Sequence, residues 1–165
     1  MITIKESGME FGPFDESQVY HIEKSQLYKK TQNVKTVEFI LNIGTNSLQF
    51  VEAKSGSPRP VPDNNVSFEN FICEISEKFL HSLNLYYSAI LKRHESNNDI
   101  PNRFKNLNNE GLAIKFLLVI KGHQLEWLPP IREALNQKLI SYGSIWNFEI
   151  AVINDDMALK HRLIS

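Results

Sequence analysis

The amino-acid sequence predicts an α/β fold. Two kinds of pattern alternate along the chain: short apolar, β-branched runs typical of buried strands, and longer segments with apolar residues at three- and four-residue spacing, typical of amphipathic helices. The chain has 165 residues, of which 42% are hydrophobic and 22% charged, a composition that is ordinary for a globular protein. This length predicts a single domain over residues 1–165.

The chain is expected to begin with a small β element. Residues 2–5 alternate apolar and polar side chains as a strand does, and turn residues separate them from a second short extended piece at residues 11–14. Residues 19–22 fit either a strand or a helix. We expect a helix over residues 24–31.

Residues 36–54 predict a β-hairpin. Its first arm, TVEFILNI, and its second arm, LQFVEAK, are apolar, and the connecting GTNS has turn chemistry. Side chains two residues apart on a strand share a face, so Glu52 and Lys54 share a face with Phe50. The first arm carries one charged side chain, Glu38. Because both faces of the hairpin are largely apolar, we expect it inside a sheet that is covered on both sides.

A loop and a long helix follow the hairpin. Residues 55–67 are rich in proline and small polar residues, Ser67 has the chemistry of a helix N-cap, and the helix is expected to end near Arg93. Its apolar face consists of Phe68, Phe71, Ile72, Ile75, Phe79, Leu83, Tyr86 and Ile90. It also carries a polar stripe at four-residue spacing, formed by Asn70, Glu74 and Lys78. This stripe either faces the charged end of the hairpin or carries an ordinary salt bridge within the helix.

The C-terminal part alternates strands and helices. Residues 94–111 predict a long polar connection, and residues 112–122 form the continuous apolar run of a buried strand. Residues 126–143 predict a helix whose two prolines fit its first turn. A last strand is expected at residues 146–155, and a short closing helix at residues 158–165.

Charge and composition narrow the functional classes. The formal net charge is −1 at pH 7, whereas a protein that binds nucleic acid unaided usually has a positive surface. Nucleic-acid contact would rely on local clusters, such as Lys29 with Lys30 or Arg103 with Lys105, or on a partner subunit. The histidines are scattered and the single cysteine, Cys73, lies in a helical pattern, so any metal chemistry has to come from carboxylates.

The sequence also bears on cellular location. No stretch approaches the roughly 18 consecutive apolar residues of a membrane span. The first residues lack the basic and apolar segments of a signal peptide. We therefore expect a cytoplasmic protein without a membrane partner.

One acidic motif spans the two arms of the hairpin. Glu38 lies in KTVEFIL of the first arm, and the tripeptide Glu52-Ala53-Lys54 ends the second arm ahead of the long helix. In this order the residues resemble the PD-(D/E)XK, or restriction-endonuclease-like, nuclease superfamily, over roughly residues 20 to 120. Valine precedes the first acid where the family has proline, and that acid is glutamate where aspartate is usual. The resemblance implies a restriction-endonuclease-like core, with a mixed central sheet flanked by helices.

The resemblance also implies a metal-dependent nuclease that hydrolyses phosphodiester bonds, with DNA as the expected substrate. The expected cofactor is Mg²⁺ or Mn²⁺. Its ligands would be the carboxylates of Glu38 and Glu52 and the backbone carbonyl of Ala53, because hard cations prefer oxygen. Lys54 would orient or help to deprotonate the attacking water and offset charge on the scissile phosphate.

Further residues and partners belong to this expectation. Glu23 is the family-like additional acid on the helix ahead of the hairpin, with Glu10 and Asp15 as other candidates. Lys78 is expected to contact a substrate phosphate. A near-neutral chain without a recognition module is expected to act within a larger complex of the defence or mobile-element type, with a protein partner subunit or a second copy.

The same residues admit interpretations without catalysis. A Glu-x-Lys sequence at a strand end is often a solvated ion pair. A one-residue change in hairpin register would place Glu38 and Glu52 on opposite faces of the sheet and remove the site. Alternatively, the chain is a catalytically inactive interaction subunit that keeps the fold, which predicts an apolar partner patch and no metal affinity.

Overall fold

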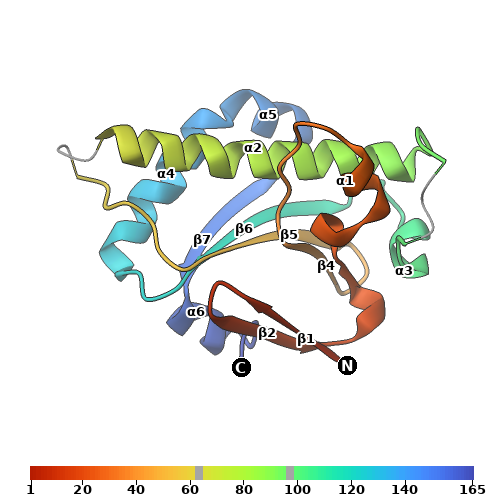
Figure 1. The fold of residues 1–165 in the computed structure, drawn as a ribbon, viewed down its shortest axis with the longest axis horizontal. Coiled ribbons are helices and arrows are strands. Elements are labelled where there is room, and N and C mark those ends of the chain that lie inside the picture. Colours follow the sequence, from red (N-terminus) through yellow and green to blue (C-terminus); the bar gives the residue numbers. More distant parts are fainter. Residues whose placement is uncertain (62–64, 96–98) are drawn as a thin grey trace.

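A mixed five-stranded sheet and a separate two-stranded antiparallel sheet form the β structure of the protein (Figure 1). The structure is a computed structural model that describes residues 1–61, 65–95 and 99–165. The strands are β1 (Ile2–Glu6), β2 (Met9–Phe14), β3 (Val19–Tyr20), β4 (Phe39–Ile43), β5 (Ser47–Lys54), β6 (Ala113–Ile120) and β7 (Glu149–Asn154). The α/β class, the mixed sheet with flanking helices and the small N-terminal β element are therefore confirmed.

Short and long helices connect these strands. They are η1 (Glu16–Gln18), η2 (Ile22–Lys24), α1 (Gln26–Lys30), α2 (Asn65–Ile90), α3 (Asn102–Lys105), η4 (Leu125–Trp127), α4 (Leu128–Lys138), α5 (Ile140–Trp146) and α6 (Asp155–Lys160). No helix in the described part of the chain combines the length and the apolar character needed to span a bilayer.

The five-stranded sheet has the order β3-β4-β5-β6-β7. β3, β4 and β5 pair antiparallel, with β4 and β5 forming the predicted hairpin, whereas β5, β6 and β7 pair parallel. Parallel neighbours require crossover connections, and α2 and the α4–α5 pair supply them. The carboxyl ends of β5, β6 and β7 therefore lie at one edge of the sheet.

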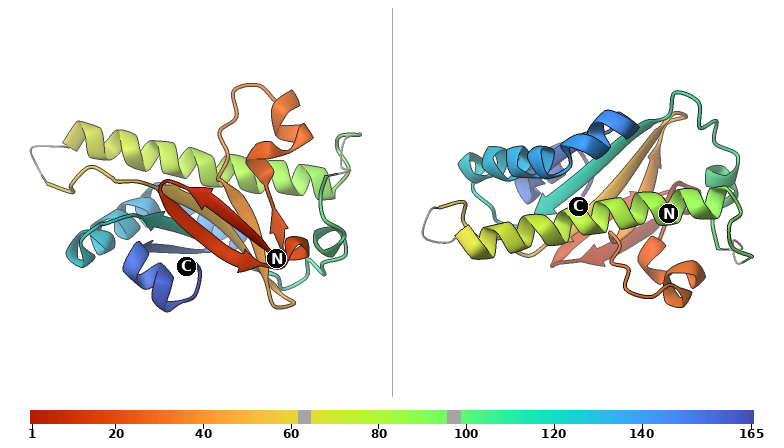
Figure 2. Two further views of the ribbon diagram at one scale, coloured as in Figure 1. Left: turned by 60° about the horizontal axis from the view of Figure 1, so that its bottom comes forward. Right: turned by 90° about the horizontal axis from the view of Figure 1, so that it is seen from above.

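Both faces of the sheet are covered, as the apolar hairpin predicts. Figure 2 shows α2 and the α4–α5 pair side by side on one face, with the β1–β2 hairpin on the other. Leu48 and Phe50 of β5 belong to the core beneath α2, whereas Val51 and Ala53 belong to the core beneath the N-terminal hairpin and α6. Side chains at alternate positions of β5 therefore pack into different cores. The side chain of Glu52 accordingly lies on the α2 side of the sheet.

The helix predicted at residues 24–31 is wrong in its bounds. Ser25 has an extended backbone, separates η2 from α1, and accepts a hydrogen bond from the Tyr28 amide as the N-cap of α1. The ambiguous segment ahead of it contributes β3, which pairs with β4.

The N-cap predicted at Ser67 is also wrong, because α2 begins at Asn65 and places Ser67 inside its first turn. The helix ends at Ile90, close to the expected Arg93. Lys92 has a φ of 53°, the left-handed conformation that ends many helices. Part of the predicted 55–67 loop and of the 94–111 connection lies outside the described residues, and the latter also contains α3.

The helix predicted at residues 126–143 is divided into η4, α4 and α5. Leu139 leaves helical geometry (φ −105°, ψ 14°) and its side chain is buried, whereas the prolines do lie in the first turn of α4. The closing helix α6 begins at Asp155, earlier than predicted. The residues after it form a turn at His161 and Arg162 instead, and Ile164 forms a bridge with Phe11 of β2.

Candidate active site

The charged side chains of β5 lie at its carboxyl end, on the face covered by α2. Lys54 Nζ donates a hydrogen bond to Glu74 Oε1 at 2.7 Å, and Lys78 Nζ donates one to Glu52 Oε1, also at 2.7 Å. Glu74 and Lys78 of the polar stripe therefore pair with residues of β5. Asn70, the third member of the stripe, is exposed.

Glu52 is fully buried, and its two carboxylate oxygens have different surroundings. Oε1 contacts Lys78 and lies 3.4 Å from Lys54 Nζ. Oε2 is buried and has no hydrogen-bond partner among the residues that the structure describes, a condition that typically costs about 1–3 kcal/mol. Burial raises the pKa of Glu52, and the two ammonium groups oppose that rise. The residue is therefore not the solvated ion pair that a Glu-x-Lys sequence often forms.

Glu38 lies just ahead of β4, and its backbone amide donates to the Val51 carbonyl of β5. Its Oε1 lies 4.0 Å from Lys78 Nζ, the same ammonium that contacts Glu52. The two acids therefore share one face of the sheet, and the alternative register that would separate them is wrong. Burial, a hydrogen bond with Glu23 and the charges of Glu52 and Glu23 raise the pKa of Glu38 to about 8. Its carboxyl group is thus mostly protonated at neutral pH.

Glu23 reaches this site from η2. The side chain of the preceding Ile22 is buried in the main core, and this anchors η2 beside the hairpin. Glu23 hydrogen-bonds with Glu38, as described above. The other acids considered lie elsewhere: Glu10 pairs with Lys5 at 2.7 Å, and Asp15 accepts from Ser17 at the start of η1.

Lys54 is a charged ammonium at neutral pH. Burial by itself would lower the pKa of Lys54, but the hydrogen bond with Glu74 and the charge of Glu52 outweigh burial and raise it. A lysine with a raised pKa is a poor general base. This arrangement favours the charge-offsetting role expected of Lys54 over the role of a proton acceptor.

The N-terminal hairpin also contributes to the site, and no pattern in the sequence indicates this contact. Ser7 Oγ, at the tip between β1 and β2, donates to the Ala53 carbonyl at 3.0 Å. Lys121 Nζ donates to the Gly8 carbonyl at 2.7 Å. Ser7 and Gly8 have φ values of 50° and 75°, which form the tight tip. The tip is thereby fixed to the carboxyl ends of β5 and β6.

The loop after Lys54 is attached to the connection between β6 and α4. Ser57 Oγ lies 3.2 Å from His123 Nε2, and the Arg59 guanidinium lies 4.8 Å from the centre of the Trp127 ring. His123 is buried, and burial lowers its pKa, so the neutral imidazole is favoured. These contacts hold the loop against the carboxyl edge of the sheet.

Solvent reaches the site from the side of α2. The exposed fraction of the side chains rises outward from the centre, from 0% and 12% for Glu52 and Glu38 to 15%, 24% and 41% for Lys78, Lys54 and Glu74. A substrate phosphate would therefore meet Glu74 and Lys54 before it met Glu38 and Glu52.

The donor chemistry of the site fits Mg²⁺ or Mn²⁺. Within the described ranges Glu52 Oε2 is an unpartnered oxygen. Burial raises the pKa of Glu38, and the charges of Glu52 and Glu23 add to this rise; a divalent cation relieves that repulsion. As the side chains lie, the described ranges contain no three His, Cys, Asp or Glu residues arranged to hold a metal ion. The ammonium of Lys78 contacts both acids and supplies positive charge there. The Ala53 carbonyl, the third expected ligand, already accepts the bond from Ser7.

The chain was compared with protein-family models, with curated proteins and with solved structures, and none of the three comparisons gave a match.

Proposed function

We propose that this protein is a metal-dependent nuclease with a restriction-endonuclease-like core, which hydrolyses phosphodiester bonds of DNA with Mg²⁺ or Mn²⁺. The observation that carries the proposal is the meeting of three acids from separate segments, Glu23, Glu38 and Glu52, with Lys54 and Lys78. The stability of the fold does not explain such a cluster, because replacing buried charged groups with apolar residues of similar volume often leaves a protein equally stable or more stable. Strongly perturbed carboxyl groups are typical of functional sites.

The proposed roles follow from where each group lies. Glu38, Glu52 and the Ala53 carbonyl would hold the ion, which when bound lowers the pKa of water and neutralises phosphate charge. Lys54 is partly exposed and charged, so it offsets negative charge that develops on the scissile phosphate. Lys78 is the second cation available to a phosphate.

Glu23 has a separate role in this proposal. It hydrogen-bonds with Glu38, and this places a further carboxyl group beside the site. Loss of the Glu38 proton adds a negative charge beside Glu52, a state that requires additional positive charge. Glu23 is therefore proposed to tune the site rather than to contact substrate.

The near-neutral charge of the chain supports action within a larger complex. With a net charge of −1, the protein has little general attraction for a polyanion. We therefore propose that a partner delivers the nucleic acid, as in complexes of the defence or mobile-element type.

A cleavage assay tests the proposal. Plasmid DNA, single-stranded DNA and RNA are incubated with the protein and Mg²⁺ or Mn²⁺, using the wild type, Glu52→Gln and Lys54→Met. Each substitution should reduce cleavage by about 100-fold or more, the effect typical of removing one group that stabilises transition-state charge. Glu77→Gln is the matched control, because Glu77 is also on α2 but forms a surface pair with Lys35. Equal cleavage by all four proteins would reject the proposed site.

The alternative is a non-catalytic interaction subunit with the same fold. The observation that favours it is the contact of Lys78 with both acids, which supplies positive charge to the site without a metal. Calorimetric titration with Mn²⁺ separates the two functions. Binding that is lost in Glu52→Gln supports the nuclease, whereas no binding to the wild type supports the interaction subunit.

A further inference from the structure

α5 is poorly covered by the rest of the protein. None of its seven residues is buried, although Ile140, Tyr142, Ile145 and Trp146 expose 60%, 43%, 74% and 37% of their surface. In Figure 1 it is the outermost element of the helix layer. So short a helix has little stability of its own, and exposed apolar area on the order of several hundred Å² is typical of a partner-binding surface.

The apolar surface continues beside α5. Trp146 stacks on Tyr87 of α2 with ring centres 5.2 Å apart. These two rings, with Leu112 and Phe148, line an open hollow of about 710 Å³. The helix face and the rim of this hollow together enlarge the area that a partner could cover.

The outward face of α5 combines a small residue with one large apolar side chain. A Cβ built on Gly143 would lie 3.7 Å from the Phe148 ring, so the Gly143 side of the helix faces the protein. With 100° of rotation per residue, Ser141 and Ile145 lie on the opposite side, and Ser144 lies on the flank of the helix. Small residues allow a second helix to approach closely, and Ile145 can pack over the serine of a neighbour.

The charges at the two ends of this surface are opposite. Residues 139–148 contain no charged side chain, whereas Lys138 precedes them and Glu149 follows them. The Glu149 side chain is 71% exposed and lies 3.5 Å from Lys115. If a second copy of α5 lies antiparallel, each Lys138 comes close to the partner's acidic end. The surface is therefore complementary to itself in charge as well as in polarity.

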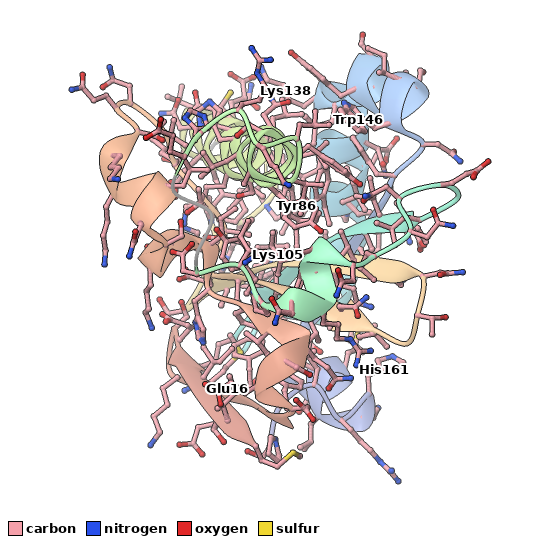
Figure 3. The ribbon with its side chains drawn as sticks, turned by 90° about the vertical axis from the view of Figure 1, so that its right-hand side faces the viewer. Glu16, Tyr86, Lys105, Lys138, Trp146 and His161 are labelled. Carbon is pink, nitrogen blue, oxygen red and sulfur yellow. The ribbon has the colours of Figure 1, made fainter. Side chains whose placement is uncertain are left out.

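We propose that α5 is the interface of a homodimer, in which two copies pack antiparallel through their outward faces. The two-fold axis crosses the helices at the level of Gly143. Such an interface is isologous, so Ile145 of each copy packs on Ser141 of the other. In Figure 3 Lys138 and Trp146 lie in the helix layer, far from Glu16 and His161 at the opposite side of the molecule. α5 leads into the amino end of β7, whereas the acids lie at the carboxyl end of β5, so dimerisation leaves the candidate active site open.

The oligomeric state of the full chain tests this proposal independently of any nuclease activity. Sedimentation equilibrium and light scattering over about 1 to 100 μM should show the 19.1 kDa chain forming a species of twice that mass. Ile145→Glu, which places two like charges at the axis, should weaken association by about 100-fold or more. Leu125→Glu is the matched control, since Leu125 is 61% exposed on η4, outside this surface, and it should dimerise as the wild type does.

Charge reversal provides a second test that does not alter the apolar face. Lys138→Glu should weaken the dimer, and the double variant Lys138→Glu/Glu149→Lys should restore it. Circular dichroism confirms that each variant is folded. A wild type that stays monomeric up to about 100 μM, or an Ile145→Glu variant that associates like the wild type, overturns the proposal.

Discussion

Replacing Glu38 with glutamine should change how the stability of the protein depends on pH. The Glu38 carboxyl has a pKa raised to about 8 by burial and by the neighbouring acids Glu23 and Glu52. In the unfolded chain the same carboxyl titrates near its ordinary value of 4.5. Between these two values the folded state holds a proton that the unfolded state has released, so the stability of the folded state falls as the pH rises.

The raised pKa sets the size of the effect. The contribution of protonated Glu38 is fully present below about pH 4.5 and is lost as the pH rises through about 8. The difference between the two pKa values corresponds to an upper limit of about 5 kcal/mol. Partial solvent access screens the charges around Glu38, which leaves about 2 kcal/mol. Glutamine cannot ionise and can still donate a hydrogen bond to Glu23, so it avoids this loss.

Urea unfolding from about pH 5 to pH 9 measures the effect. Relative to the wild type, Glu38→Gln should gain about 2 kcal/mol in unfolding free energy across this range. Glu77→Gln serves as control, because the Glu77 side chain is 51% exposed and pairs with Lys35. Its difference from the wild type should stay nearly constant with pH. If the Glu38→Gln and wild-type curves run parallel, Glu38 does not titrate in this range and the account of the acidic cluster is wrong.

Three further substitutions test individual contacts. Lys78→Met leaves the buried carboxylate of Glu52 without its 2.7 Å partner, so urea unfolding should show an unfolding free energy lower by about 3–5 kcal/mol. Mn²⁺ should restore part of this loss, and no recovery with Mn²⁺ would count against a metal at this position. Ser7→Ala removes the 3.0 Å bond to the Ala53 carbonyl and should lower the unfolding free energy by about 0.5–1.5 kcal/mol, whereas an unchanged value would mean that the hairpin tip is held by other contacts. Phe79→Ala removes a ring that stacks 4.6 Å from that of Phe116, and calorimetry should show a loss of about 3–5 kcal/mol; a loss below about 1 kcal/mol would mean that the core refills the space.

The part of the site that lies on the hairpin was predictable from local sequence. The alternation of side chains along a strand places Glu52 on the same face as Phe50, and four-residue spacing on the following helix places Glu74 and Lys78 on one stripe. The contacts between Lys54 and Glu74 and between Lys78 and Glu52 connect these two faces. Side-chain spacing predicts which residues share a face as long as they belong to the same strand or the same helix.

Contacts between distant segments were not predictable in the same way. Ser7 and the Ala53 carbonyl are 46 residues apart, and nothing in the short N-terminal strands indicates that their tip reaches β5. The bounds near Ser25 and Leu139 were missed for a related reason. Each of these residues leaves helical geometry at a single position, while the apolar pattern on either side continues as in one helix.

The protonation of Glu38 links the stability of the site to its proposed chemistry. In the folded protein the positive charge of Lys54 and Lys78 faces Glu52, and a proton neutralises Glu38. A divalent cation would compete with that proton and with the Lys78 ammonium for the same oxygens, so its affinity should rise with pH. The arrangement that keeps three acids together without a metal is thus the same one that makes metal affinity depend on pH.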